Sequence, residues 1–204
     1  MRAPELAAVE VPGMTRGAFI LRGALAAGAV YGVQAVTPFA DCAFASVSTG
    51  DLDIVSFALS VENLEAAFYK TALAKGALAA DVKKLATEIG GHEQEHVATL
   101  SNALQILGGK VPKPGAYKFP FTDQPSFLKL AARLEDTGVA AYNGAAPSIQ
   151  SPDILATVGS IVQVEARHAA AVRERGGQLP APMAFDRTLT TAQVTAALKP
   201  FGGP

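Results

Sequence analysis

The sequence predicts an all-α protein in which two antiparallel helical hairpins, joined by a long crossover, form a four-helix bundle followed by a short C-terminal helix. Three observations carry this prediction. Half of the 204 residues are apolar, alanine is abundant and tryptophan is absent, a composition that favours helices over sheets. The pattern Glu-x-x-His occurs twice, at Glu93–His96 and Glu165–His168. A segment rich in Pro and Gly, residues 108–123, lies between the two copies.

The first hairpin is predicted from the residues that start and stop its helices. In the first helix, Asp51 and Asp53 can cap the N-terminus and complement its dipole, and the helix ends near Gly76. The second helix runs from about Leu78 to the Gly108-Gly109 stop. The connection between them is short, which is typical of antiparallel neighbours.

The second hairpin follows the long segment GGKVPKPGAYKFPFTD, which has no helical periodicity and supplies the crossover. The third helix opens at Thr122 or Asp123 and is ended by Pro147. A cap followed by proline, Ser151-Pro152-Asp153, starts the fourth helix, which stops at Gly176-Gly177. The bundle is therefore expected to span residues 46–178.

The remaining residues, 179–204, are predicted to be a C-terminal extension. It contains an extended segment with several prolines, and then a capping box, Thr190-Thr191-Ala192-Gln193, that starts a short helix. We expect this helix to pack against the bundle.

The two hairpins repeat the same chemistry-bearing residues at matched spacings. In each, a Glu precedes a Tyr by seven residues, about two helical turns, so the two side chains share a face. The same Glu precedes the Glu-x-x-His pair by 31 positions in one hairpin and 30 in the other. Residues three apart also share a face, so the Glu and His of each pair can reach one point. The residues are Glu62, Tyr69, Glu93 and His96 in the first hairpin and Glu135, Tyr142, Glu165 and His168 in the second.

On these residues the chain resembles the ferritin-like superfamily, and in particular the ferritin-like domain of desiccation-related and other exported bacterial proteins. The resemblance covers roughly residues 51–175. It implies a bundle whose core holds two metal ions, bound by one Glu from each of two helices and by Glu-x-x-His from each of the other two. The implied ligands are Glu62, Glu93, His96, Glu135, Glu165 and His168.

The chemistry of this set favours a pair of divalent metal ions, iron or manganese, and the resemblance implies iron. Four carboxylates and two imidazoles in a bundle core need compensating charge, which two divalent metals supply. Oxygen and imidazole ligands suit two Fe ions, or alternatively Mn. In such a centre Glu93 and Glu165 would bridge the metals, while the other carboxylates and the imidazoles would each hold one. By the resemblance, the centre would oxidise Fe(II) with oxygen or peroxide. Tyr69 and Tyr142 could hydrogen-bond to the ligand carboxylates.

Several residues have a second interpretation. Glu65 lies three residues after Glu62 and could face the core in its place. His92 could bind metal at an entrance to the site or lie on the solvated face of its helix. Tyr69 and Tyr142 could be core residues with a satisfied hydroxyl, without any part in chemistry. The whole set could also be a coincidence on solvated helix faces.

The first 45 residues are predicted to be an export signal, so that the protein acts outside the cytoplasm. An uncharged, Ala- and Gly-rich run from Gly23 to Ala40 precedes the small-x-small pattern Ala43-Phe44-Ala45. Thr15-Arg16 is similar to a twin-arginine signal, but Gly17 stands where the second arginine belongs. The run is short and poor in Leu and Ile for a permanent membrane span. The alternative is an uncleaved arm that packs on a neighbouring copy in a homo-oligomer.

Two functions follow from these observations. The first is a di-iron oxidase or peroxidase, or an iron-handling protein, in stress protection. The second is a stress-related, surface or assembly protein that uses the bundle as a scaffold. A net charge of -1 and a pI near 6.3 argue against nucleic acid as a partner. The sequence has no Gly-rich phosphate loop, no nucleophile elbow and no Cys cluster.

Overall fold

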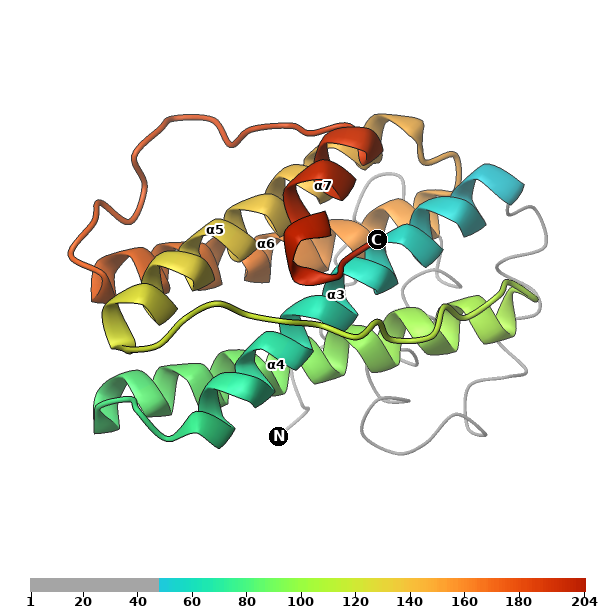
Figure 1. The fold of residues 1–204 in the computed structure, drawn as a ribbon. Coiled ribbons are helices and arrows are strands. Elements are labelled where there is room, and N and C mark those ends of the chain that lie inside the picture. Colours follow the sequence, from blue (N-terminus) through green and yellow to red (C-terminus); the bar gives the residue numbers. More distant parts are fainter. Residues whose placement is uncertain (1–47) are drawn as a thin grey trace, which may run out of the picture.

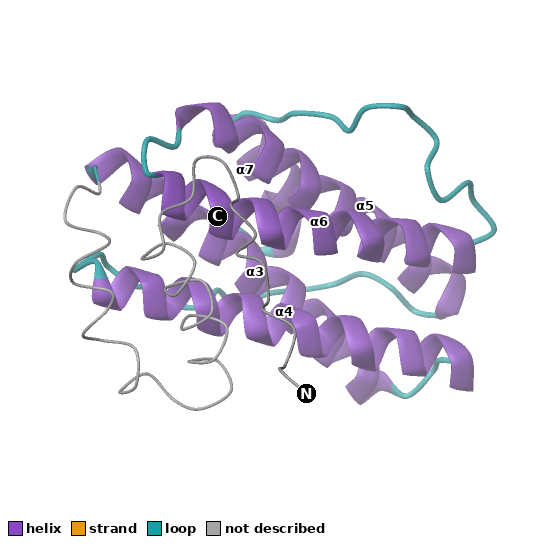
Figure 2. Cartoon of the chain, turned by 180° about the vertical axis from the view of Figure 1, so that it is seen from behind, coloured by secondary structure: helices purple, strands orange, loops and turns teal. Residues whose placement is uncertain are grey.

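A computed structural model of the chain describes residues 48–204, and the predicted export signal lies outside this range. Two long helical hairpins form the bundle (Figures 1 and 2). The first is α3 (Thr49–Lys75) with α4 (Ala80–Ile106), and the second is α5 (Gln124–Ala145) with α6 (Pro152–Arg175). The 3-10 turn η2 (Ala146–Ser148) follows α5, and α7 (Thr191–Leu198) and the 3-10 turn η3 (Lys199–Phe201) end the chain. No strand occurs in residues 48–204, so the all-α prediction is confirmed.

The helix ends form where local sequence signals predict them. α3 stops at Gly76, which adopts the left-handed conformation with φ 68°. Asp123 caps α5 in a capping box with Ser126, Ser151 caps α6, and Thr190 caps α7. One prediction was wrong in detail, because the cap of α3 is the Ser48 hydroxyl, which accepts from the N–H of Asp51.

The crossover determines which helices become neighbours. In Figure 1, residues 107–123 run back along the whole bundle, so α5 starts at the end where α4 also starts. α3 then packs against α4 and α5, while α6 packs against α5 and α4. A short connection could not bridge this length, which is why the bundle requires a long segment at this place.

An aromatic cluster fixes the crossover to the bundle. The ring of Phe68, on α3, lies within 5.5 Å of three other phenylalanine rings, centroid to centroid. Two of them, Phe119 and Phe121, belong to the crossover, and Phe127 belongs to α5. The side chain of Lys75 adds an ammonium group 4.0 Å from the centre of the Phe121 ring. These contacts join both hairpins next to Tyr69, whose ring also packs on Phe68.

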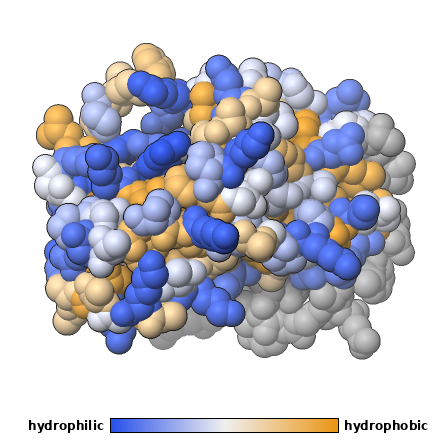
Figure 3. Space-filling model, viewed as in Figure 1, coloured by the Kyte–Doolittle hydropathy of each residue, from blue (hydrophilic) through white to orange (hydrophobic). Residues whose placement is uncertain are grey.

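The C-terminal extension packs on the bundle, as expected. Val194, Leu198 and Phe201 are buried in the same core as the aromatic cluster. Between α6 and α7 the chain exposes Leu179, Met183 and Phe185. On the face shown in Figure 3, hydrophilic side chains surround apolar areas. None of the described helices combines the length and the apolar character needed to span a bilayer.

Asp51 has a structural role that its position in the first turn of α3 does not suggest. Its side chain is fully buried. One carboxylate oxygen accepts from the N–H of Gln150 at 2.8 Å, and the other accepts from the N–H of Ser151 at 3.0 Å. Asp51 therefore ties the start of the first hairpin to the turn between α5 and α6.

We expect Asp51→Ala to lower the free energy of unfolding by about 3 kcal/mol, because two N–H groups lose a charged acceptor. Asp53→Ala is the matched control, since Asp53 is exposed in the same turn, and its effect should stay within about 0.5 kcal/mol. Urea unfolding followed by circular dichroism measures both. Equal effects of the two substitutions would contradict the assigned role of Asp51.

Candidate metal centre

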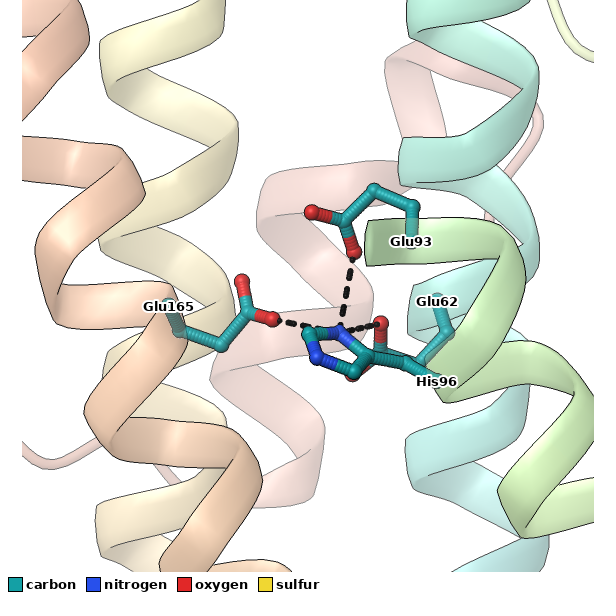
Figure 4. A group of neighbouring side chains, drawn as sticks. All are labelled: Glu62, Glu93, His96 and Glu165. Atoms are coloured by element: carbon teal, nitrogen blue, oxygen red, sulfur yellow. Dashed lines mark hydrogen bonds and ion pairs between the residues drawn. The ribbon is translucent and has the colours of Figure 1, made fainter. Parts of the chain in front are cut away.

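The side chains that the repeat singles out converge in the middle of the bundle. α3 and α5 each contribute one Glu, and α4 and α6 each contribute a Glu and a His. They form two groups, in each of which one ligand atom per residue lies within 4.8 Å of the others. Glu93 and Glu165 belong to both groups. The first group is Glu62, Glu93, His96 and Glu165 (Figure 4), and the second is Glu93, Glu135, Glu165 and His168.

In the first group, three carboxylates surround the ring of His96, as Figure 4 shows. The Nδ1 atom of His96 lies 2.8 Å from Oε1 of Glu165, 3.3 Å from Oε2 of Glu62 and 3.4 Å from Oε2 of Glu93. These oxygens come from α6, α3 and α4, so the ring nitrogen is approached from both hairpins.

The second group is built in the same way around His168. Its Nδ1 atom lies 2.9 Å from Oε1 of Glu93, 3.4 Å from Oε2 of Glu135 and 3.8 Å from Oε2 of Glu165. Glu93 thus presents one oxygen to each imidazole, and Glu165 does the same. Each of these two carboxylates spans the two groups.

The two tyrosines hold the remaining carboxylates, each from the opposite hairpin. The hydroxyl of Tyr69 on α3 donates to Oε1 of Glu135 on α5, and the hydroxyl of Tyr142 on α5 donates to Oε1 of Glu62 on α3. The Oε2 atom of each Glu is then left to face an imidazole. The sequence places each tyrosine on the same helix face as its own Glu, but only the packing of α3 against α5 exchanges the partners.

Glycine at one position of α4 permits this arrangement. A Cβ atom on Gly90 would lie 2.9 Å from the Cβ atom of Tyr69. The absence of a side chain lets α4 approach α3 closely at the level of the site.

Glu65 is the buried carboxylate that the sequence left in competition with Glu62. Glu62 belongs to the first group, whereas Glu65 belongs to neither. The Glu65 side chain is nevertheless buried, and both its oxygens lack a hydrogen-bond partner among the described residues. A Cβ atom on Gly138 would lie 2.9 Å from Oε1 of Glu65. Gly138 follows Glu135 by three positions, as Glu65 follows Glu62, so the missing side chain in one hairpin makes room for the extra carboxylate of the other.

Two further ionisable residues next to Glu93 and His96, Glu95 and His92, lie outside both groups. Glu95 is exposed. His92 is half-buried and belongs to neither group. Its Nδ1 atom lies 3.0 Å from the Nε2 atom of His168, on the side of that ring away from the carboxylates.

The pKa values of the buried carboxyl groups depend on burial and on the charges of their neighbours in the site. Burial, together with the charge of Glu165, raises the pKa of Glu62 and of Glu65 well above the usual value. Burial and the neighbouring carboxylates raise the pKa of Glu135 to about 8, although His168 lowers it. Burial would also raise the pKa of Glu93, but the two imidazoles close to its carboxylate lower it to about 2.

The same carboxylates raise the pKa values of the imidazoles and of the tyrosines. Burial lowers the pKa of His96 and of His168, but the carboxylates around each ring outweigh it and raise the pKa to about 12. Burial raises the pKa of Tyr69 and Tyr142 well above the usual value, and Glu135 and Glu62 raise it further. The tyrosines are therefore neutral donors.

The site has the donor set and the unsatisfied atoms that a metal pair would use. Both oxygens of Glu93 and of Glu165, Oε2 of Glu135 and Nδ1 of His168 lack hydrogen-bond geometry with any described residue. These atoms come close together without forming hydrogen bonds, so their desolvation is poorly compensated by the protein itself. Two divalent cations would balance the four carboxylates of the groups, with the imidazoles as neutral ligands.

Known proteins resemble this chain in sequence and in fold. The model of a family described as "Ferritin-like domain" matches residues 50–178, which contain all six converging side chains. Among solved structures, a conserved hypothetical protein, rv2844, from Mycobacterium tuberculosis is similar, with a TM-score of 0.58 and 19% identity. The match covers 67% of this chain and 97% of that one. At this identity the likeness shows the fold alone. A comparison with curated proteins finds no match.

We expect the chelator-treated protein to lose stability as the pH rises above about 6.5, the pKa of an unfolded His. His96 and His168 bind protons more tightly when folded, so their contribution is complete below that pH and is lost as the pH rises toward 12. Glu135, with a folded pKa of about 8, adds a loss between about 4.5 and 8. The midpoint of thermal unfolding at pH 6 and pH 9 measures the effect. In a His96→Gln/His168→Gln variant, the midpoint should change less between the two pH values. A midpoint that rises with pH in the unaltered protein would contradict the expectation.

Proposed function

This chain is a member of the ferritin-like domain family, and on that premise we propose that its six converging side chains bind two divalent metal ions. The metals we propose are iron or, as the alternative, manganese, because carboxylate oxygens combined with imidazole nitrogens suit both. Within the described residues the two groups consist of carboxylates and imidazoles alone, so these donors do not match the thiolate-rich structural zinc sites.

The observation that carries the proposal is the position of Glu93 and Glu165. Each turns one oxygen to His96 and the other to His168. A carboxylate shared in this way can bridge two metals held a few ångströms apart, and two such carboxylates define two metal positions. In the proposal, His96 and Glu62 complete one position, and His168 and Glu135 complete the other.

The tyrosines support the same assignment. The hydroxyls of Tyr69 and Tyr142 donate to Oε1 of Glu135 and of Glu62, and Oε2 of each Glu faces an imidazole nitrogen. A terminal carboxylate held through one oxygen would bind its metal through the other. Partners that orient metal ligands in this way are as much a part of a metal site as the ligands themselves.

We propose Fe(II) oxidation by oxygen or peroxide as the reaction of this centre. Two bound Fe(II) ions would supply the two electrons that, with two protons, reduce hydrogen peroxide to two waters. The chain's own part is to bind the metals, to keep them in a buried site, and to hold the terminal carboxylates by hydrogen bonds that a neutral tyrosine donates. A further round would need an external reductant for the oxidised iron.

The alternative is a scaffold function without turnover, and one observation favours it. In the absence of metal, both imidazoles can be protonated and can pair with the surrounding carboxylates. This internal pairing offsets part of the cost of burying the cluster. A stress-related, surface or assembly protein could therefore keep the bundle folded without iron. Export and stress protection remain predictions from the sequence.

Metal content is the first test of the two functions. We expect the full chain, purified without chelators, to carry about two equivalents of iron or manganese by elemental analysis, or to take up two Fe(II) anaerobically. The double variant Glu93→Gln/Glu165→Gln should lose both metals, because each substitution removes a shared ligand. Glu95→Gln, an exposed carboxylate on the same helix, should keep both.

Oxygen or peroxide is then added to the Fe(II)-loaded protein, and oxidation is followed by absorbance. Rapid oxidation that the double variant lacks supports the oxidase or peroxidase. Helical protein that binds no Fe(II) even under anaerobic conditions would overturn the metal centre and leave the scaffold function.

We expect Tyr69→Phe and Tyr142→Phe each to weaken metal binding by about 10-fold or more, because a ligand carboxylate loses the donor that orients it. Anaerobic Fe(II) titration measures the two affinities. Tyr117→Phe is the matched control, since Tyr117 packs on Phe119 and lies outside both groups. Equal affinities in all three variants would show that Tyr69 and Tyr142 serve the core alone.

A further inference from the structure

The two imidazoles of the candidate metal centre have similar partners at Nδ1 but different surroundings at Nε2. Nδ1 of His168 faces the carboxylates, and Nε2, on the other side of the ring, lies 3.0 Å from Nδ1 of His92. The two rings are nearly parallel, with 10° between their planes. Nδ1 of His96 also faces carboxylates, but no hydrogen bond from its Nε2 atom is found within residues 48–204.

The difference originates in the sequence repeat. His92 directly precedes Glu93, and the residue that directly precedes Glu165 is Val164. His92 on α4 reaches the His of α6, and the reciprocal contacts of Glu93 and Glu165 show that the hairpins face each other in equivalent ways. In the repeat, Val164 is therefore the residue of the second hairpin that corresponds to His92. A valine side chain cannot accept a hydrogen bond.

The contact with His92 has a definite consequence for a metal ligand. A neutral imidazole that gives its Nδ1 lone pair to a metal carries its proton on Nε2. In His168 that proton lies within hydrogen-bond distance of His92, whose Nδ1 can accept it. Such an outer partner fixes the tautomer and the orientation of the ring and strengthens it as a ligand.

The two imidazole rings also differ in their exposure to solvent. The His168 side chain is 5% exposed and that of His96 is 11% exposed. The ring without an outer partner is thus also the one more open to solvent.

We propose that His92 is a positioning residue that makes the two metal positions unequal, so that the His168 position fills first and holds its metal more tightly. This inference rests on the proposed metal centre. It also assigns His92 a role different from direct metal binding, because His92 belongs to neither group and its Nδ1 atom is turned to His168.

Titration of the metal-free full chain with Co(II), followed by visible absorption, tests the inference. The unaltered protein should bind two Co(II) in two resolved steps. The single-site variants His96→Ala and His168→Ala assign the steps, and only His168→Ala should lose the tighter one. Two Co(II) bound with equal affinities would overturn the inference and leave the metal centre standing. A protein that binds neither Co(II) nor Fe(II) would overturn both.

Substitution of His92 tests its role directly, because only the tighter Co(II) binding step should change. His92→Val should weaken the tighter step by about 10- to 100-fold and leave the weaker step unchanged. His92→Gln should restore part of the loss, because its amide oxygen can accept from Nε2. A general packing defect would instead weaken both steps together, and that result, or no change in either step, would overturn the role of His92.

The exchange His92→Val/Val164→His completes the design. Val164 is half-buried on α6, and a histidine there should supply His96 with the partner that it lacks. We expect the order in which the two metal positions fill to reverse in this double variant, as assigned by adding His96→Ala or His168→Ala.

In the Co(II)-loaded protein, the exchangeable Nε2 proton of the tighter ligand gives a hyperfine-shifted NMR signal. This signal should belong to His168 in the unaltered chain and to His96 after the exchange. An order that stays the same would contradict the inference.

Discussion

Burial of many ionisable groups in one small volume is the constraint on which the rest of the structure depends. Carboxylates and imidazoles that leave water lose their hydration, and they are stable only where opposite charges, donors or metals replace it. No single helix can provide this compensation, and each of the two imidazoles faces carboxylates from both hairpins. The helices must therefore pack with a defined register and rotation. The groups concerned are Glu62, Glu65, Glu93, Glu135, Glu165, His96 and His168.

Reciprocity between the hairpins is how the fold meets this constraint. Tyr69 of the first hairpin holds Glu135 of the second, and Tyr142 of the second holds Glu62 of the first. The long crossover makes this possible because it places α5 antiparallel beside α3 (Figure 1). Phe68 and the crossover phenylalanines then fix α3, α5 and the crossover together close to the site. The packing of the core and the geometry of the site are therefore parts of the same arrangement.

Departures from the repeat are as informative as the repeat itself. Glu65 and His92 both belong to the first hairpin, and their counterparts in the second are Gly138 and Val164, which bring no polar group. Glu65 fills the space that Gly138 leaves, and His92 contacts the imidazole of His168. The two groups of carboxylates and imidazoles, which have matching residue types, are in this way given unequal surroundings. Inequality of this kind is what allows two metal positions to differ in affinity and in exchange with solvent.

The sequence by itself determined the helices, the long crossover and the set of side chains that share a helix face. It could do so because caps, prolines, glycines and the 3.6-residue period act within a few positions of one another. Only the tertiary structure decided that Glu62 and not Glu65 joins the groups, that the tyrosines exchange partners, and that His92 contacts His168. It also showed that Asp51 accepts hydrogen bonds from residues about 100 positions away. These outcomes depend on how helices distant in the chain rotate and approach, which local spacing does not encode.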